Sequence, residues 1–294
     1  MSDQPSPAPA LSFGGVAAAY DRARPAYPRE AAAWLAGEQP TTVLELGAGT
    51  GKLTEVLVGL GHDVHATDPD EQMLAVLRER LPGVRTTLAG AEELAVPDAS
   101  YDVVVVAQAF HWFDHERALP EIARVLKPGG RLAVVWNARD ERIPWVRRLG
   151  QVLGGHAKDP EASPERVLVR SPLFGFVEEE MFRFWQVVDR ESIQDLALSR
   201  SNVAVLDEAD RAARLAEVLA FYDDYGRGMD GMQLPYQACC LRVTVVDRPQ
   251  ADPDGPEERS AEGSGRPSGQ SSGQGAPAPV TDGSDTDMLL IDFR

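Results

Sequence analysis

The sequence predicts an α/β protein built on a doubly wound, mostly parallel β-sheet of seven strands. Between residues 41 and 137, short apolar runs alternate with amphipathic helical patterns. That alternation is typical of parallel strands with helices on both faces of the sheet. Two further strand-like runs, near residues 177–188 and 234–246, are joined by helical patterns and are expected to extend the same sheet.

Five apolar runs supply the first strands of this sheet. They are short, rich in Val, Leu and Thr, and lie at residues 42–46, 63–67, 84–88, 101–106 and 131–136. Runs of this length, bounded by turn-forming residues, are what strands buried on both faces require. Later helices are expected around residues 142–153, 191–199 and 207–225.

Two helices between these strands have clear stripes and clear ends. One carries Leu53, Val56, Leu57 and Leu60 and should end at Gly61, since glycine after the last apolar position is a stop signal. The other carries Leu119, Ile122 and Leu126 and should end at residues 127–130. Pro120 is expected in its first turn, because an interior proline removes a helix hydrogen bond.

The composition divides the chain into three regions. Residues 1–12 are expected to be a disordered N-terminus, and residues 13–248 to form one domain with a core at 41–137 and a lid plus late strands at 138–248. Residues 249–294 are dominated by Gly, Pro, Ser, Asp and Glu. This composition buries too little apolar surface to offset ordering entropy, so the tail is expected to be disordered.

Charge and composition exclude several functions. With 46 acidic and 29 basic residues the formal net charge is −17, which repels nucleic-acid phosphates. No apolar run approaches the roughly 18 residues of a membrane span, and no export signal is recognised. Cys239 and Cys240 are neighbours that a strand would point to opposite faces, so no disulfide is expected. We therefore expect a cytoplasmic protein.

A glycine-rich turn, Glu45-Leu-Gly-Ala-Gly-Thr-Gly51, lies between the first strand and the first helix. Glycines there let the backbone turn sharply and approach a ligand closely. A dinucleotide fingerprint would place glycine where Lys52 stands, and a phosphate loop would need glycine at Leu46 and a hydroxyl residue at Leu53. A ligand without phosphate, with an amino-acid end, fits Glu45 and the glycines better.

Acidic and apolar residues after the next two strands suit the rest of a nucleoside. Asp68 closes the second strand, where such folds place an acid that binds ribose hydroxyls, and Met73 offers an apolar face to a purine. Gly90-Ala-Glu-Glu-Leu94 follows the third strand and offers backbone groups and an acid to the adenine edge. For Glu92 and Glu93, a purely solvated charge is an equal alternative.

In this order the motifs resemble the type 11 branch of class I methyltransferases. The resemblance rests on Glu45–Gly51, Asp68, Gly90-Ala-Glu92, Tyr101-Asp-Val-Val104 and Leu126-Lys-Pro-Gly-Gly130. Tyr20-Asp-Arg-Ala-Arg-Pro-Ala-Tyr-Pro28 and Ala107-Gln-Ala-Phe-His-Trp-Phe-Asp114 are similar to a subgroup that includes trans-aconitate methyltransferase-like small-molecule enzymes. The resemblance covers residues 13–137 well and 138–248 loosely.

The resemblance implies S-adenosylmethionine as methyl donor and a small molecule as acceptor. By this resemblance the methionine end of the cofactor would be held by Glu45, Gly47, Gly49 and Gly51, and its ribose by Asp68. The adenine would contact Met73, Ala91 and Glu92, and Gln108 would lie below the transferring methyl group. Tyr20 and Arg24 would close over the bound cofactor. The resemblance implies neither a nucleic-acid nor a membrane partner. A nicotinamide oxidoreductase and a cofactor-binding protein without catalysis are the competing interpretations.

The fourth strand should deliver Gln108, His111 and Trp112 to the edge of the sheet where ligands bind. His111 is the candidate general base or acceptor-orienting group, because an imidazole titrates near neutrality. A packed structural corner is an equal alternative for His111 and Trp112, and a carboxylate acceptor would need no base. No metal is expected, since no His, Cys, Asp or Glu cluster has ligand spacing. Aromatic residues between Arg139 and Tyr236 are expected in the lid.

Overall fold

The structure is a computed structural model that describes residues 21, 23–154, 163–199, 203, 206–225 and 231–246. All of these residues belong to one unit of the chain, Met1–Arg248. The expectations for residues 1–12, Tyr20 and the acidic tail lie outside the described residues.

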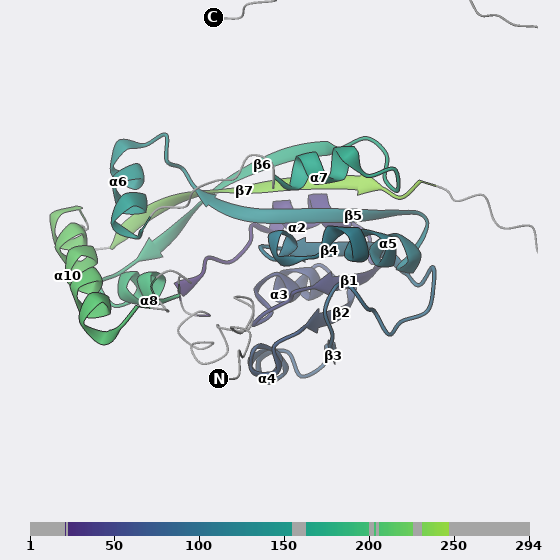
Figure 1. Ribbon diagram of the computed structural model, residues 1–294, viewed down its shortest axis with the longest axis horizontal. Coiled ribbons are helices and arrows are strands. Elements are labelled where there is room, and N and C mark those ends of the chain that lie inside the picture. Colours follow the sequence, from purple (N-terminus) through teal and green to yellow (C-terminus); the bar gives the residue numbers. More distant parts are fainter. Residues whose placement is uncertain are drawn as a thin grey trace, which may run out of the picture. The chain divides into compact units, whose positions relative to one another are not determined.

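The seven strands form a single mostly parallel sheet, as the sequence predicts (Figure 1). The strand order is β3-β2-β1-β4-β5-β7-β6, with β7 antiparallel to both of its neighbours. The strands are β1 (Thr42–Leu46), β2 (Asp63–Asp68), β3 (Arg85–Leu88), β4 (Tyr101–Ala107), β5 (Leu126–Arg139), β6 (Glu178–Val188) and β7 (Met232–Thr244). The order changes direction at β1 and β4, which in such sheets marks the ligand-binding crevice.

Helices cover both faces of the sheet. They are α2 (Arg29–Ala36), α3 (Lys52–Gly59), α4 (Glu71–Arg80), α5 (His115–Val125), α6 (Pro144–Val152), α7 (Pro164–Arg170), α8 (Ser192–Leu198) and α10 (Glu208–Tyr225). Apolar side chains of α2 and α3 pack with Val43, Val103 and Val105, whereas α5 and α7 pack with Leu44 and Val104 on the opposite face. Because both faces are covered, the centre of β4 is buried throughout.

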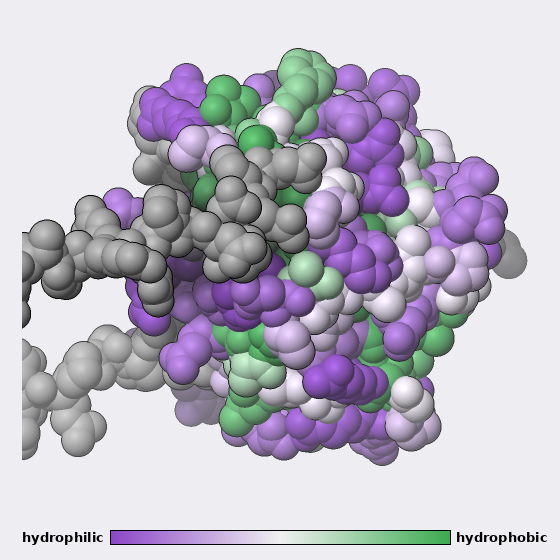
Figure 2. All heavy atoms as spheres, turned by 90° about the vertical axis from the view of Figure 1, so that its right-hand side faces the viewer, coloured by the Kyte–Doolittle hydropathy of each residue, from purple (hydrophilic) through white to green (hydrophobic). Residues whose placement is uncertain are grey.

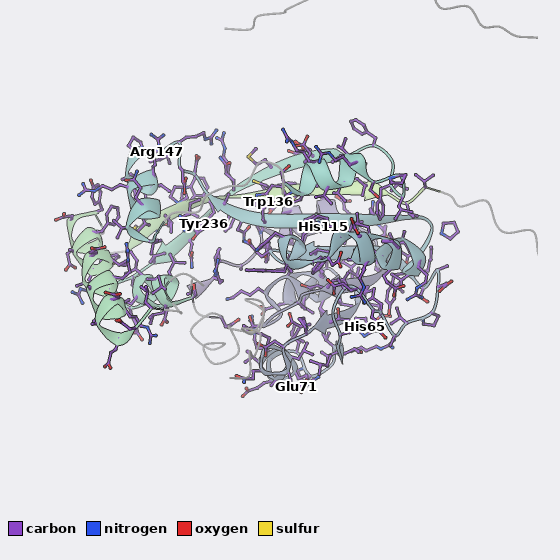
Figure 3. The ribbon with its side chains drawn as sticks, in the orientation of Figure 1. His65, Glu71, His115, Trp136, Arg147 and Tyr236 are labelled. Atoms are coloured by element: carbon purple, nitrogen blue, oxygen red, sulfur yellow. The ribbon has the colours of Figure 1, made fainter. Side chains whose placement is uncertain are left out.

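The antiparallel strands reach further than the parallel ones. In β5, β6 and β7 the strand lengths are 14, 11 and 13 residues, against 5 in β1. Helices α6, α8 and α10 gather at the projecting end (Figure 1), where they share an apolar cluster with Leu234 and Tyr236 of β7. Tyr236 lies between Trp136 of β5 and α6, which carries Arg147 (Figure 3). The expected lid region is therefore a packed helical layer on this extension.

One local prediction was wrong. Helix α5 begins at His115, capped by the Asp114 side chain on the Glu116 N–H, so Pro120 lies in its interior and not in its first turn. The sequence favoured a later start because proline suits the first turn, but the Asp114 cap fixes the start five residues earlier. This helix also ends at Val125, and the glycine-rich residues 127–130 belong to β5.

Two helices were not predicted. Helix α2 contains a run of six consecutive small or apolar residues after Glu30, and α7 starts at Pro164 after the Ser163 cap. Both are short, so tertiary packing contributes more to them than intrinsic propensity.

The surface of the molecule is mixed in character. On the side seen in Figure 2, small hydrophobic patches are interspersed among hydrophilic residues. Within the described ranges, no helix is long and apolar enough to cross a membrane.

The interior position of Pro120 generates a stability prediction. Pro120→Ala should raise the free energy of unfolding by about 2 kcal/mol, because alanine restores a helix hydrogen bond, partly offset by greater freedom of the unfolded chain. The side chain is exposed, so the core is undisturbed. Urea denaturation measures the change. Pro144→Ala is the matched control: that proline opens α6, where no hydrogen bond is missing, and its replacement should not stabilise. Equal effects would contradict the explanation.

Candidate active site

The glycine turn connects β1 to α3 through three left-handed residues. Gly47, Gly49 and Gly51 have φ values of 67°, 57° and 84°, and Gly51 caps the N-terminus of α3. Residues with a Cβ rarely adopt this backbone region. The spacing of the glycines is therefore dictated by the turn itself.

The three glycines differ in what surrounds them. A Cβ on Gly47 would lie 2.4 Å from the Cβ of Ala109, and one on Gly51 would lie 2.8 Å from Leu77 Cγ. A Cβ on Gly49 would meet nothing within 4 Å. Packing thus requires Gly47 and Gly51 to lack side chains, whereas Gly49 borders open space at the carboxyl edge of the sheet.

Asp68, at the end of β2, holds this turn in place. Its Oδ2 accepts the backbone N–H of Gly49 at 2.8 Å and its Oδ1 accepts that of Asp70 at 2.9 Å. Burial raises the pKa of Asp68 against the opposing effect of these two hydrogen bonds. A carboxylate has about four acceptor positions, so two remain for further donors.

Glu45 is the buried acid beneath the turn. Its Oε2 accepts the hydroxyl of Thr54 at 2.7 Å, while no atom of the described residues hydrogen-bonds its Oε1. Burial, reinforced by the charge of Asp68, raises the pKa of Glu45 to about 8, although the Thr54 hydrogen bond opposes the shift. Buried polar atoms are normally hydrogen-bonded, so Glu45 Oε1 is free to accept a hydrogen bond from a ligand.

The residues expected at the adenine lie next to Asp68. The Asp68 carbonyl accepts the N–H of Ala89, which brings the segment after β3 alongside, and Met73 and Ala91 are both buried. Glu92 Oε1 accepts the N–H of Asp114 at 3.0 Å. Glu92 is thus not a merely solvated charge, because it ties this segment to the start of α5.

Gln108 follows β4 with a φ of 60°, which is unusual for a residue with a side chain. Its N–H donates to Val135 O at 2.9 Å, and its Nε2 donates to Asn137 O at 3.4 Å. Strained backbone of this kind persists where neighbouring structure enforces it, often at functional sites. Because Ala109 contacts Gly47, Gln108 lies beside the glycine turn.

His111 and Trp112 lie in a single turn of 3-10 helix, Phe110–Trp112. Their rings are 4.5 Å apart at 42°, and both side chains are exposed, whereas Phe110 is buried. The pKa of His111 is lowered by desolvation from surrounding atoms and by His115. His115 holds the turn through its Nε2, which lies 2.9 Å from Phe110 O. In the part of the chain described, nothing hydrogen-bonds the His111 ring.

The N-terminal segment spans the site from one side to the other. Asp21 accepts the Thr50 hydroxyl at 2.7 Å and Arg80 Nη1 at 2.6 Å, which fastens it to the glycine turn. Arg24 Nη2 donates to Ser199 O at 3.1 Å, beyond α8. Arg24 therefore bridges from the N-terminal segment towards the helical layer. Tyr20 is outside the described residues.

Sequence reasoning missed two polar residues at the end of β5. Asn137 Oδ1 and Arg139 Nε are buried, and no described atom hydrogen-bonds either. They lie in the last residues of β5, after a stretch buried as far as Val135, at the edge where ligands of open sheets bind. Polar residues directly after a buried strand were the signal that could have identified them.

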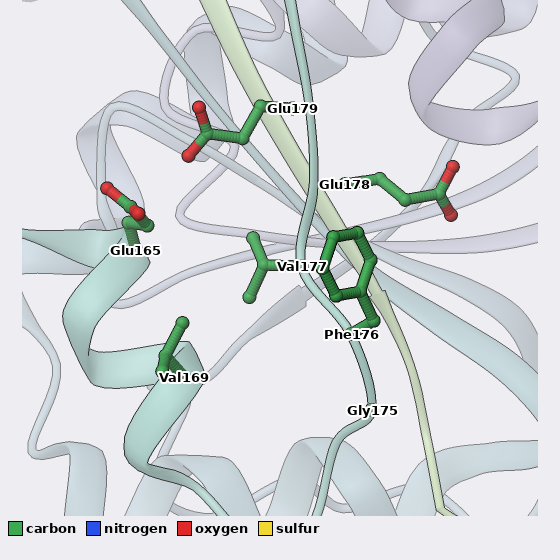
Figure 4. A pocket seen from close by; sticks show the side chains of 7 residues that line it. All are labelled: Glu165, Val169, Gly175, Phe176, Val177, Glu178 and Glu179. Carbon is green, nitrogen blue, oxygen red and sulfur yellow. The ribbon is translucent and has the colours of Figure 1, made fainter.

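A separate hollow lies on the described surface, away from these residues. This hollow, between α7 and the start of β6, is lined by Glu165, Val169 and residues 175–179 (Figure 4). None of the expected site residues lies in it. Among the described residues, no three His, Cys, Asp or Glu side chains are grouped so that they could hold a metal ion.

The raised pKa of Glu45 generates a prediction about stability. A folded-state pKa near 8, above the unfolded value of 4.5, means that the stabilisation is complete below pH 4.5 and is lost as pH rises through 8. From pH 6 to pH 8 Glu45 should therefore cost about 2 kcal/mol of unfolding free energy. Glu45→Gln should lack this loss in denaturation experiments at the two pH values. An identical pH dependence in both proteins would contradict the assignment.

Comparisons with known proteins agree with this geometry. A methyltransferase domain family matches residues 44–134. The chain is 44% identical over 239 residues to an uncharacterized methyltransferase of Mycobacterium tuberculosis, covering 80% of this chain and 96% of the relative. It is 35% identical over 147 residues to the trans-aconitate 2-methyltransferase of Variovorax paradoxus, covering 49% of this chain and 54% of that protein.

A solved structure from Anaeromyxobacter dehalogenans, assigned to the type II methyltransferases, is also similar. It shares 25% identity and a TM-score of 0.56, over 75% of this chain and 97% of that one. The glycine turn, Asp68 and Gln108 converge on the carboxyl edge of a sheet ordered as above. With a relative that matches nearly end to end, this chain belongs to the class I methyltransferases, in the type 11 branch, and is an S-adenosylmethionine-dependent enzyme of that family.

Proposed function

We propose that the protein transfers the methyl group of S-adenosylmethionine to an oxygen, nitrogen or carbon atom of a small molecule, with a carboxylic acid as the favoured acceptor. One observation carries this proposal: Gly49 borders open space at the carboxyl edge of the sheet while its N–H donates to Asp68, and the buried acid Glu45 lies four residues earlier in β1. A ligand with a cationic amino group and a ribose suits that arrangement better than a phosphate does.

The described residues fit the cofactor. Glu45 has a buried acceptor without a donor, which an amino group would satisfy. Asp68 keeps acceptor positions for ribose hydroxyls while it holds Gly49. Met73 and Ala91 supply an apolar surface to the adenine, and the segment of Glu92 supplies backbone groups. Tyr20 and Arg24 would close the site from the N-terminal segment.

The chemistry requires mainly positioning. When bound, the cofactor supplies a methyl group that its sulfonium already makes electrophilic. The protein has to align the acceptor with that group and exclude water. Gln108, held by Val135 O and Asn137 O, would form the floor below the methyl group, and its strained backbone keeps it there.

His111 and Trp112 would face the acceptor. The His111 ring has no hydrogen-bond partner among the described residues, so it is available to accept a proton or to orient a substrate. Its lowered pKa keeps the ring neutral at pH 7, the form in which a base works. Exposed Trp112, whose ring is tilted against that of His111, would offer an apolar surface to a small acceptor.

Acceptor class and location are also proposals. The trans-aconitate 2-methyltransferase relative is named for an acid substrate, which supports a carboxylic acid here. The net charge of −17 disfavours nucleic acids as acceptors. We place the enzyme in the cytoplasm, with no membrane partner.

The open side of Gly49 allows the cofactor assignment to be tested. Gly49→Ala should leave the protein folded, since its Cβ meets no protein atom, but should weaken S-adenosylmethionine binding at least 100-fold by occupying the ligand's space. Calorimetry measures the affinity. Gly129→Ala is the matched control, because Gly129 has a φ of 73° and equally open surroundings far from the site. If both variants bind the cofactor as well as the parent does, the assignment fails.

The pH dependence of turnover can distinguish a general-base role of His111 from an orienting role. If His111 is a base, His111→Gln should lower turnover about 100-fold with cofactor affinity intact. The parent rate should fall as pH drops through the lowered imidazole pKa, below its usual 6.5, because the protonated ring cannot accept a proton. An orienting role would instead give a loss that is the same at every pH. Unchanged turnover and acceptor Michaelis constant would return His111 to a structural role.

A further inference from the structure

Arg139 is a buried cation that lacks the hydrogen bonds such a group normally makes. Its side chain is only 10% exposed, its Nε is fully buried, and no described atom accepts a hydrogen bond from its guanidinium. The nearest carboxylate oxygen is Glu141 Oε1, 3.7 Å from Nη2, on a side chain that is half exposed. The Nε–H donor is thus removed from water without an acceptor, on a largely buried cation that has a single distant counter-ion.

Three other arginines of the fold make hydrogen bonds through their Nη atoms, which Arg139 does not do within the described part of the chain. Arg131 donates to Ala36 O, and Arg242 donates to both Trp34 O and Glu178. Arg124 is bound by Glu121 and Asp98 and by two carbonyl groups. Burying a charge without partners is strongly unfavourable, so such a group points to a ligand that completes it.

The position of Arg139 connects it to the proposed site. Asn137 and Arg139 are two residues apart on β5, so their side chains lie on the same face of the sheet. The backbone oxygen of Asn137 accepts Gln108 Nε2, and its side-chain Oδ1 is buried without a donor. A line of unsatisfied polar groups therefore runs from the floor of the methyl-transfer site towards the helical layer.

Aromatic rings flank the same row of the sheet. Arg139 pairs with Tyr236 across β5 and β7, and Tyr236 pairs with Phe184 across β7 and β6. The two rings are stacked, with centroids 5.5 Å apart. The two rings therefore place an apolar surface beside the Arg139 cation, a combination that suits a small organic acid.

Two segments close over this face. Ala26 O accepts Asn137 Nδ2 at 3.4 Å, and Ala23 O accepts Gln186 Nε2 at 2.9 Å, so the N-terminal segment crosses it. In α6, a Cβ on Gly150 would lie 3.7 Å from Arg139 Nη2. The face is therefore sheltered from water, where a charge pair is worth more than at the surface.

We propose that Arg139 binds a carboxylate of the methyl acceptor, with Asn137 Oδ1 accepting a hydrogen bond from a second polar group of the same molecule. This rests on the methyl-transfer function proposed above and names the substrate class for that site. The planar guanidinium of Arg139 can bind a carboxylate through two parallel hydrogen bonds, and the half-exposed Glu141, 3.7 Å away, leaves that position open to such a group.

Thermal-shift titration of the protein with trans-aconitate and with fumarate tests the proposal, and the neutral trimethyl ester of trans-aconitate and inorganic phosphate serve as comparison probes. The acids should raise the melting temperature at millimolar concentration, and the ester and phosphate should not. No protection by either acid, or equal protection by the ester or phosphate, would overturn the proposal.

Arg139→Met should abolish the protection by the acids. Its ligand-free melting temperature should equal or exceed that of the parent, because an unpaired buried charge has been removed. A substantial fall in the melting temperature of a folded variant that keeps the protection by the acids would mean that Arg139 is structural and would overturn the proposal. Arg142→Met is the matched control: Arg142 is exposed and paired with Asp140, and its loss should leave the protection intact.

Arg139→Lys keeps the charge but not the fork, and should weaken protection about tenfold. The lysine variant also tests the proposal if the methionine variant does not fold. If Arg139→Lys binds the acids as tightly as the parent does, carboxylate binding by the guanidinium is contradicted. Calorimetry with S-adenosylhomocysteine runs in parallel. If the protein does not bind S-adenosylhomocysteine, the proposed methyl-transfer function is contradicted. Binding of the acids that depends on Arg139 would still be supported in that case.

Discussion

The site depends on one carboxylate. Asp68 accepts the N–H of Gly49 with one oxygen and that of Asp70 with the other, so it joins the glycine turn to the start of α4. Without this contact the Gly49 N–H would have no side-chain partner on β2. Because these bonds leave acceptor positions free, the same group can shape the turn and bind a ligand.

Charge is arranged in order along the carboxyl edge. At the cofactor end, burial raises the pKa values of both Glu45 and Asp68, which suits a ligand whose own positive charge would favour their ionised forms. At the other end stands Arg139, a cation short of partners. Gln108 lies between them, uncharged and fixed by strained backbone. A cationic donor and an anionic acceptor would therefore be drawn to opposite ends of one site.

The extended antiparallel strands support the layer formed by helices α6, α8 and α10. In β5, β7 and β6 the pairing continues beyond the last parallel pair, to Arg139–Tyr236 and Val188–Met232, and supports α6, α8 and α10. The match to the methyltransferase domain family stops at residue 134, before this extension. The strand extension and the helices packed on it are thus built by a part of the chain that the family pattern does not describe.

The sequence by itself determined the strands, the glycine turn and Asp68, because each depends on local periodicity or on backbone conformations that only glycine adopts. The placement of Pro120 inside α5 escaped it, since one capping aspartate outweighed the preference of proline. Tertiary structure alone brought Asp21 to Arg80, 59 residues away, and left Arg139 buried beside Tyr236. These contacts depend on the register between β5 and β7 and on the path of the N-terminal segment across the sheet. A local sequence pattern encodes neither.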